Sequence, residues 1–179
     1  MKAFLGACCI VLLLAGCSVP RAIREGGPMP GQRVDPVGKV LILGVKDGQE
    51  QGQSPAQGSG QELVDSLRKV LAEHSVPLST TPAQALPAGF DEAVSGGWNY
   101  VLKGEITHWE DNATAWSGKG DKLFISVELY DAKTKQLVAA ATEQRTATGF
   151  TFVSGTPDRF MDEVSVGALS KIYGWPIAK

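Results

Sequence analysis

The sequence has few of the side chains that most enzymes and metal sites depend on. All three cysteines, Cys8, Cys9 and Cys17, lie within the first 17 of 179 residues, and the whole chain holds two histidines. Thiolate catalysis and thiolate metal sites are therefore excluded from the rest of the chain. A hydrolytic triad would have to use His74 or His108, and no Gly-x-Ser-x-Gly nucleophile motif is present. We expect a protein that is not an enzyme and that binds no metal ion or cofactor.

Positive charge and long apolar runs are also scarce. Lysine and arginine together number 17 against 19 aspartates and glutamates, which gives a formal net charge of -2. Nucleic-acid binding requires a clear excess of positive charge, so that class of partner is not expected. The apolar run from Leu5 to Leu14 is about ten residues long, which is too short to cross the roughly 30 Å core of a bilayer as a helix.

That apolar run is typical of a signal peptide because Lys2 precedes it and small residues follow it. The sequence Leu14-Ala15-Gly16-Cys17 resembles a bacterial lipobox. The resemblance implies that residues 1–16 are removed and that Cys17 is acylated, with palmitate among the acyl chains. More than one acyl chain is needed for stable anchoring. Lipoproteins kept in the inner membrane usually carry Asp after this cysteine. Ser18 therefore predicts an outer-membrane lipoprotein on the periplasmic face.

The mature chain divides into a short linker and one domain. Residues 17–36 contain Pro20, Pro28, Pro30 and Pro36 together with several glycines, which predicts a flexible tether. Residues 37–179 are long enough for a single periplasmic domain with its own core.

Hydrophobic periodicity within that domain predicts an α/β (α+β) fold. Residues 39–45 form a continuous apolar run and are expected to be the first and central strand. Residues 60–73 have an amphipathic helical pattern, and residues 122–130 alternate as a half-buried strand. The full prediction is strands at 39–45, 76–80, 100–106, 122–130 and 136–148, and helices at 60–73, 90–95 and 156–173. The order β-α-β-α-β-β-β-α indicates a mixed sheet with helices mainly on one face.

The densest polar and aromatic cluster is Thr107-His108-Trp109-Glu110-Asp111-Asn112-Ala113-Thr114-Ala115-Trp116-Ser117-Gly118. This motif resembles a family of uncharacterised Gram-negative lipoproteins, annotated only as a domain of unknown function. The layout of the chain is similar to the small periplasmic modules of the TolB amino-terminal domain and of CsgG-like accessory lipoproteins. These resemblances imply an envelope setting, and they imply no activity.

The cluster supplies the candidate interaction residues His108, Trp109, Glu110, Asp111 and Trp116. On a strand, His108 and Glu110 share one face and Asp111 takes the other, so the three ligands of a catalytic zinc site are not expected to converge. We expect His108 and the carboxylates to hydrogen-bond the loop. The two indoles have two possible roles, as core anchors or as exposed contacts for a partner.

The leading hypothesis is a membrane-anchored, non-enzymatic interaction or assembly module of the cell envelope, with an envelope protein as partner. The alternative is a small-ligand or envelope-glycan binder, in which aromatic side chains of the loop from His108 to Gly120 stack on a sugar or headgroup. Burial of Trp109 and Trp116 favours the first hypothesis, and exposure in a pocket favours the second.

Overall fold

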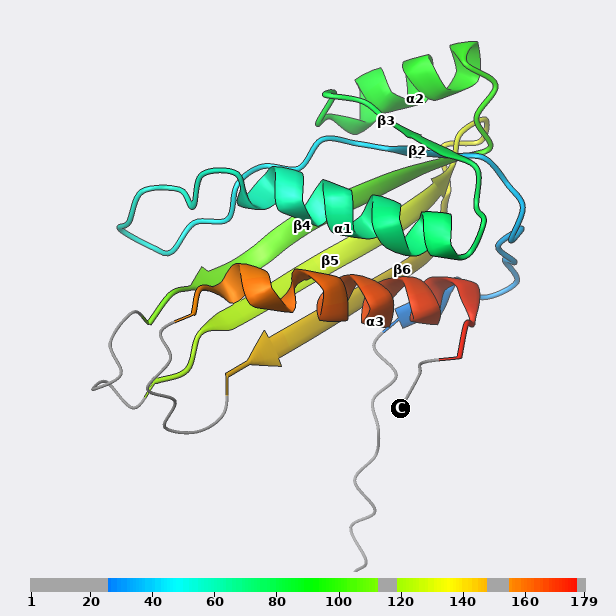
Figure 1. Ribbon diagram of the computed structural model, residues 1–179. Helices are drawn as coiled ribbons and strands as arrows, with labels where there is room; N and C mark the ends of the chain where they lie inside the picture. Colours follow the sequence, from blue (N-terminus) through cyan, green and yellow to red (C-terminus); the bar gives the residue numbers. More distant parts are fainter. Residues whose placement is uncertain (1–25, 113–118, 148–154, 177–179) are drawn as a thin grey trace, which may run out of the picture.

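The computed structural model describes residues 26–112, 119–147 and 155–176, so the leader, Cys17 and Trp116 lie outside the described residues. Figure 1 shows the chain as one sheet with helices packed on it. The elements are β1 (Gly26–Pro28), β2 (Val40–Ile42), α1 (Ser59–Glu73), β3 (Leu78–Thr80), α2 (Leu86–Ser95), β4 (Tyr100–Glu110), β5 (Lys122–Asp131), β6 (Leu137–Thr146), the 3-10 turn η1 (Pro157–Phe160) and α3 (Met161–Tyr173). Across these described ranges, no helix is both long and apolar enough to span a membrane.

The sheet has six strands in the order β1-β6-β5-β4-β2-β3. Strand β2 runs parallel to both β3 and β4, because α1 and α2 carry the chain back between these strands. Strands β4, β5 and β6 follow one another through short connections and pair antiparallel. The predicted mixed α+β sheet is therefore confirmed.

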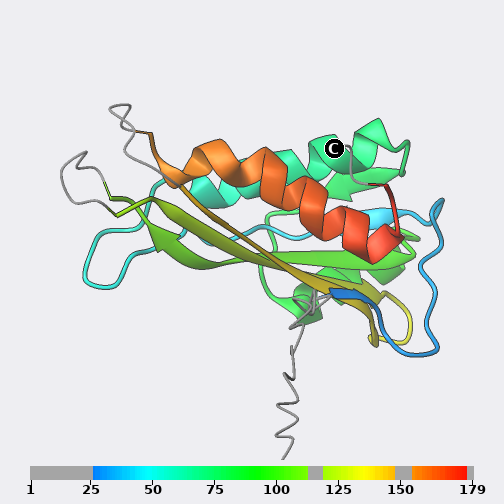
Figure 2. The ribbon, with the colours of Figure 1, turned by 90° about the horizontal axis from the view of Figure 1, so that it is seen from below.

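The two faces of the sheet are covered unequally. Figure 2 shows α1 and α3 on one side and α2 on the other. Alternate residues of β5, namely Leu123, Ile125, Val127 and Leu129, are fully buried in the core that α1 and α3 cover. A smaller cluster joins Phe90 and Ala93 of α2 to apolar residues on the opposite face of β2 and β4. Helices lie mainly on one face, as predicted.

The structure corrects the predicted tether and the place of the first strand. Residues 26–28, expected within the tether, form β1 and pair antiparallel with Ala139–Ala141 of β6. A Cβ on Gly26 would lie 2.7 Å from Ala141 Cα, so glycine is needed for this close approach. Strand β2 is therefore the second strand, and it lies beside the edge strand β3 instead of at the centre of the sheet.

Several boundaries also differ from the prediction. Strand β4 continues to Glu110, four residues beyond the predicted end, because its pairing with β5 extends to Lys122. Helix α2 begins at Leu86, with Pro87 in its first turn. The predicted last helix starts as the separate turn η1. The longer β4 places His108, Trp109 and Glu110 on a strand.

The outer edge of β6 is closed by cationic side chains where β1 no longer covers it. Lys171 Nζ donates to the Thr142 carbonyl oxygen at 3.0 Å, and Arg145 Nη1 donates to the Gln144 carbonyl oxygen at 2.8 Å. Positive charges at a sheet edge oppose pairing with another strand. The fold thus protects this edge against unwanted association.

Candidate functional site

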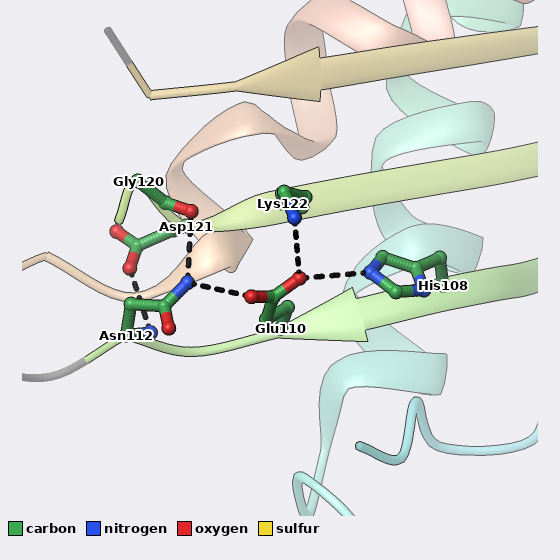
Figure 3. A network of polar contacts seen from close by, with 6 residues as sticks. All are labelled: His108, Glu110, Asn112, Gly120, Asp121 and Lys122. Carbon is green, nitrogen blue, oxygen red and sulfur yellow. Dashed lines mark hydrogen bonds and ion pairs between the residues drawn. The ribbon is translucent and has the colours of Figure 1, made fainter. Parts of the chain in front are cut away.

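The predicted polar residues gather where β4 ends and β5 begins (Figure 3). The register shifts between Ile106 and His108, which identifies a bulge at Thr107. Beyond the bulge, the side chains of His108 and Glu110 lie on the same face of β4, and Trp109 points into the core between them. Glu110 is paired with Lys122 across the two strands. The prediction that His108 and Glu110 share a face is confirmed.

Glu110 is the centre of this network. Its Oε2 accepts a hydrogen bond from Lys122 Nζ at 2.7 Å and lies 3.2 Å from His108 Nε2, and its Oε1 accepts one from Asn112 Nδ2 at 3.1 Å. The bonds from Lys122, Asn112 and His108, in that order, lower the pKa of Glu110 from 4.5 to about 2. The side chain is 17% exposed, so Glu110 is an ionised, well-partnered carboxylate at neutral pH.

Asn112 and Asp121 close the end of the hairpin. The Asn112 N–H donates to Asp121 Oδ1 at 3.0 Å, and Asn112 Nδ2 donates to the Gly120 carbonyl oxygen at 2.9 Å. Asp121 Oδ2 accepts a bond from Arg159 Nη2 at 2.6 Å, and Asp121 is buried. The Asp121 carboxylate therefore ties the β4–β5 end to η1.

Asp111 stands apart from these residues. Its Oδ1 is buried, and no hydrogen-bond partner for it exists among the described residues. Burial is the main cause that raises the pKa of Asp111, followed by the negative charges of Asp121, Glu50 and Asp158. No group of three or more His, Cys, Asp or Glu side chains in the described ranges is arranged to hold a metal ion. The structure brings His108 and Glu110 together and leaves Asp111 elsewhere.

Trp109 is 7% exposed and belongs to the large core cluster. The backbone of Gly48 packs against it, since a Cβ there would lie 2.9 Å from Trp109 Cε3. Of the two roles left open by the sequence, Trp109 has that of a core anchor. Trp116 lies outside the described residues.

Sequence reasoning did not identify Lys122, Asn112, Asp121 or Arg159 as members of the network. Lys122 was visible only as a polar residue of an alternating strand, and its partnership with Glu110 depends on the strand register. Arg159 reaches Asp121 from 38 residues away. Cross-strand pairing and tertiary packing, which local patterns do not encode, bring these side chains together.

The start of α1 is bound by side chains of the protein itself. Asp47 Oδ1 accepts a bond from the Gly60 N–H at 2.9 Å, and Ser59 Oγ accepts one from the Gly48 N–H at 2.9 Å. A carboxylate of the protein itself therefore occupies the position where a helix amino terminus would bind an anion.

The pKa of Glu110 leads to a pH-dependent prediction. Because the folded-state pKa lies below the ordinary value, ionised Glu110 stabilises the fold above about pH 4.5, and this contribution is lost as the pH falls toward 2. We expect Glu110→Gln to lower the urea midpoint at pH 7 and to match the parent protein near pH 2. Equal midpoints at pH 7 would contradict the network. Glu105→Gln, which changes an exposed glutamate on the same strand, is the control.

Comparisons with known proteins identify similar folds and do not identify a family. No family profile matches the sequence, and no curated protein is significantly similar to it. Among solved structures, the PelC dodecamer from Paraburkholderia phytofirmans superposes with a TM-score of 0.56 at 18% identity, covering 83% of this chain and 96% of that chain. Lipoprotein GNA1162 from Neisseria meningitidis gives a TM-score of 0.51 at 11% identity, covering 66% of this chain and 88% of that chain. At least one bacterial lipoprotein, GNA1162, therefore has this fold.

Protein XCC0632 from Xanthomonas campestris is a further match, with a TM-score of 0.50 at 13% identity and coverage of 83% of this chain and 91% of that chain. That protein belongs to DUF330, a family of unknown function. At such identities the likeness concerns the fold alone. The family suggested by the motif from His108 to Gly118, and the similarity to the TolB and CsgG layouts, stay predictions.

Proposed function

We propose that this protein is a lipid-anchored, non-enzymatic lipoprotein of the bacterial outer membrane that works on the periplasmic side by binding other envelope proteins. The observation that carries the proposal is a lipobox-like sequence ending at Cys17, in a chain whose domain has the fold of lipoprotein GNA1162. The leader and the fold are separate features of the chain, and both indicate a lipoprotein.

The polar network supports a structural role at the end of the β4–β5 hairpin. Glu110 has three donors around it, and Asp121 is held by Asn112 and Arg159. A general base needs a free lone pair within reach of a substrate proton, and these two carboxylates already accept bonds from the protein. Burial of Trp109 also removes one of the two indoles on which the ligand-binding alternative depended.

Fractionation of the cell envelope tests the anchor. We expect the parent protein in the outer-membrane fraction, and Cys17→Ala in the soluble fraction or retained with an uncleaved leader. Cys9→Ala is the matched control, because it changes a cysteine within the leader and keeps the acylation site. A Cys17→Ala variant that stays with the outer membrane in processed form would contradict the proposal.

Self-association is one form that assembly would take. The PelC structure with the same fold is a dodecamer, which supports the proposal that copies of this domain also join one another. We expect native mass spectrometry of the detergent-extracted protein to show multimers whose proportion rises with protein concentration. A monomer throughout the micromolar range would contradict self-assembly and leave the anchor unaffected.

A further inference from the structure

Strand β4 is paired with β2 only along its first three residues, Tyr100 to Leu102. Strand β2 ends at Ile42, whereas β4 continues to Glu110. The Leu43 N–H still donates to the Leu102 carbonyl oxygen at 2.9 Å, and the Gly44 N–H then donates to Ala83 at 2.9 Å, on the β3 side. The chain after β2 thus turns away from β4, and the side of β4 beyond Leu102 has no paired strand.

The backbone groups on this side of β4 can be assigned from the register. In an antiparallel strand, alternate residues direct both N–H and C=O to the same neighbour. Leu102 faces β2, so Gly104 and Ile106 face the same way, and the intervening Lys103 and Glu105 face β5. Beyond Leu43, no hydrogen bond from the described part of the chain reaches the backbone of Gly104 or Ile106 on this side.

A cavity of about 380 Å³ opens beside these groups. Its walls are residues 44–47 with Gln49 and Gln84 on one side and residues 103–106 of β4 on the other. The volume is in the range of known ligand sites, roughly 300–1,000 Å³. The cavity also lies past the carboxyl end of β2, between connections that lead to α1 on one face and α2 on the other, where open α/β sheets commonly bind ligands.

The two sheet edges differ in how they are protected. Lys171 and Arg145 cap carbonyl groups along β6, whereas no side chain of the described residues caps Gly104 or Ile106. Unpaired strand edges promote association and are normally blocked. The β4 edge therefore lacks the side-chain caps of the β6 edge; Gly104 itself is buried and Ile106 is half-buried beside the cavity.

We propose that this slot between residues 44–49 and β4 binds an extended polypeptide segment of a partner protein, which adds to the sheet as a strand on Gly104 and Ile106. This inference deepens the proposed function by naming the chemistry of the partner. Two residues that face outward allow up to about four backbone hydrogen bonds, and main-chain bonds of this kind provide the affinity in strand addition.

An extended peptide fits the slot better than a small ion. Gly104 and Ile106 are two residues apart, so their N–H and C=O groups repeat at about 7 Å, which is the repeat of a partner strand. The charged walls offer no single sign, because Lys46 and Lys103 are balanced by Asp47 and Glu105. Lys103 is moreover already paired with Glu105 and Glu128. The slot would therefore recognise its partner through backbone hydrogen bonds.

The test is NMR on the isotope-labelled mature protein in detergent micelles, titrated with the peptide acetyl-Thr-Val-Thr-Val-Thr-amide. We expect the amide signals of Gly104 and Ile106 to shift and saturate at millimolar peptide, and their hydrogen exchange to slow at least tenfold. A peptide with the same side chains and an N-methyl group at every residue is the control, because it lacks the backbone donors of both strand edges. This control is expected to cause no shift.

Three results would overturn the proposal: no shift at Gly104 and Ile106, equal shifts with the methylated peptide, or shifts confined to the β6 edge around Gln144. This experiment is independent of the anchor test. Peptide binding together with a soluble Cys17→Ala protein supports both proposals, whereas correct fractionation without peptide binding refutes the slot alone.

Discussion

Trp109→Ala is expected to lower the free energy of unfolding by about 3–5 kcal/mol, the usual cost of truncating a buried tryptophan. The indole is 7% exposed and lies in the main core cluster, and the Gly48 backbone packs directly on it. Because backbone lies on one side of the ring, the cavity left by alanine cannot close without moving the loop before α1. Urea denaturation at 25 °C, followed by far-UV circular dichroism, measures the loss.

Val94→Ala is the matched control for this measurement. Val94 is 54% exposed on α2, so its truncation should change the free energy of unfolding by less than about 0.5 kcal/mol. If Trp109→Ala were as stable as Val94→Ala, the indole would not be a core anchor, and the ligand-stacking alternative would regain its first aromatic residue.

Asp121→Ala should cost about 3 kcal/mol, the second largest effect we expect. Asp121 is 5% exposed, and its carboxylate accepts bonds from the Asn112 N–H and from Arg159. Alanine would leave a guanidinium and a backbone amide without their acceptor at the junction of β4, β5 and η1. The same urea experiment at pH 7 measures the loss.

Asp111→Asn is the contrasting control and should leave stability unchanged or raise it. Asp111 Oδ1 is buried without a partner in the described part of the chain, and burial and neighbouring carboxylates raise its pKa above 3.8. A raised pKa means that the folded state holds the proton more tightly, so stability falls as the pH rises through that pKa. Asparagine removes this loss. Equal destabilisation by Asp121→Ala and Asp111→Asn would contradict the assignment of separate roles.

The fold was largely predictable because most of its elements carry local patterns. Strand β5 alternates apolar and polar residues and is buried on alternate residues, and α1 shows a helical stripe that is buried as expected. Strand β1 could not be predicted. Its three residues look like a loop, and they become a strand through close contact with Ala139–Ala141, a pairing more than a hundred residues away in sequence.

The candidate site was also predictable only where a local pattern determines it. The alternation of a strand was enough to place His108 and Glu110 on one face and Asp111 elsewhere. The bulge at Thr107 decides which of these side chains point into the core, and a bulge of this kind has no local signature here. The partners Lys122 and Arg159 depend on register and on the packing of η1.

The pairing of β1 with β6 also determines how the fold responds to force. Any pull on the chain before Gly26 enters the domain through β1, which three residues and the bond from the Met29 N–H to the Val138 carbonyl oxygen hold at the sheet edge. Detaching these three residues would lengthen the chain ahead of Met29 by roughly 10 Å, while the core under α1 and α3 would keep its own contacts. A load applied before Gly26 would therefore act on β1 before it acted on the core.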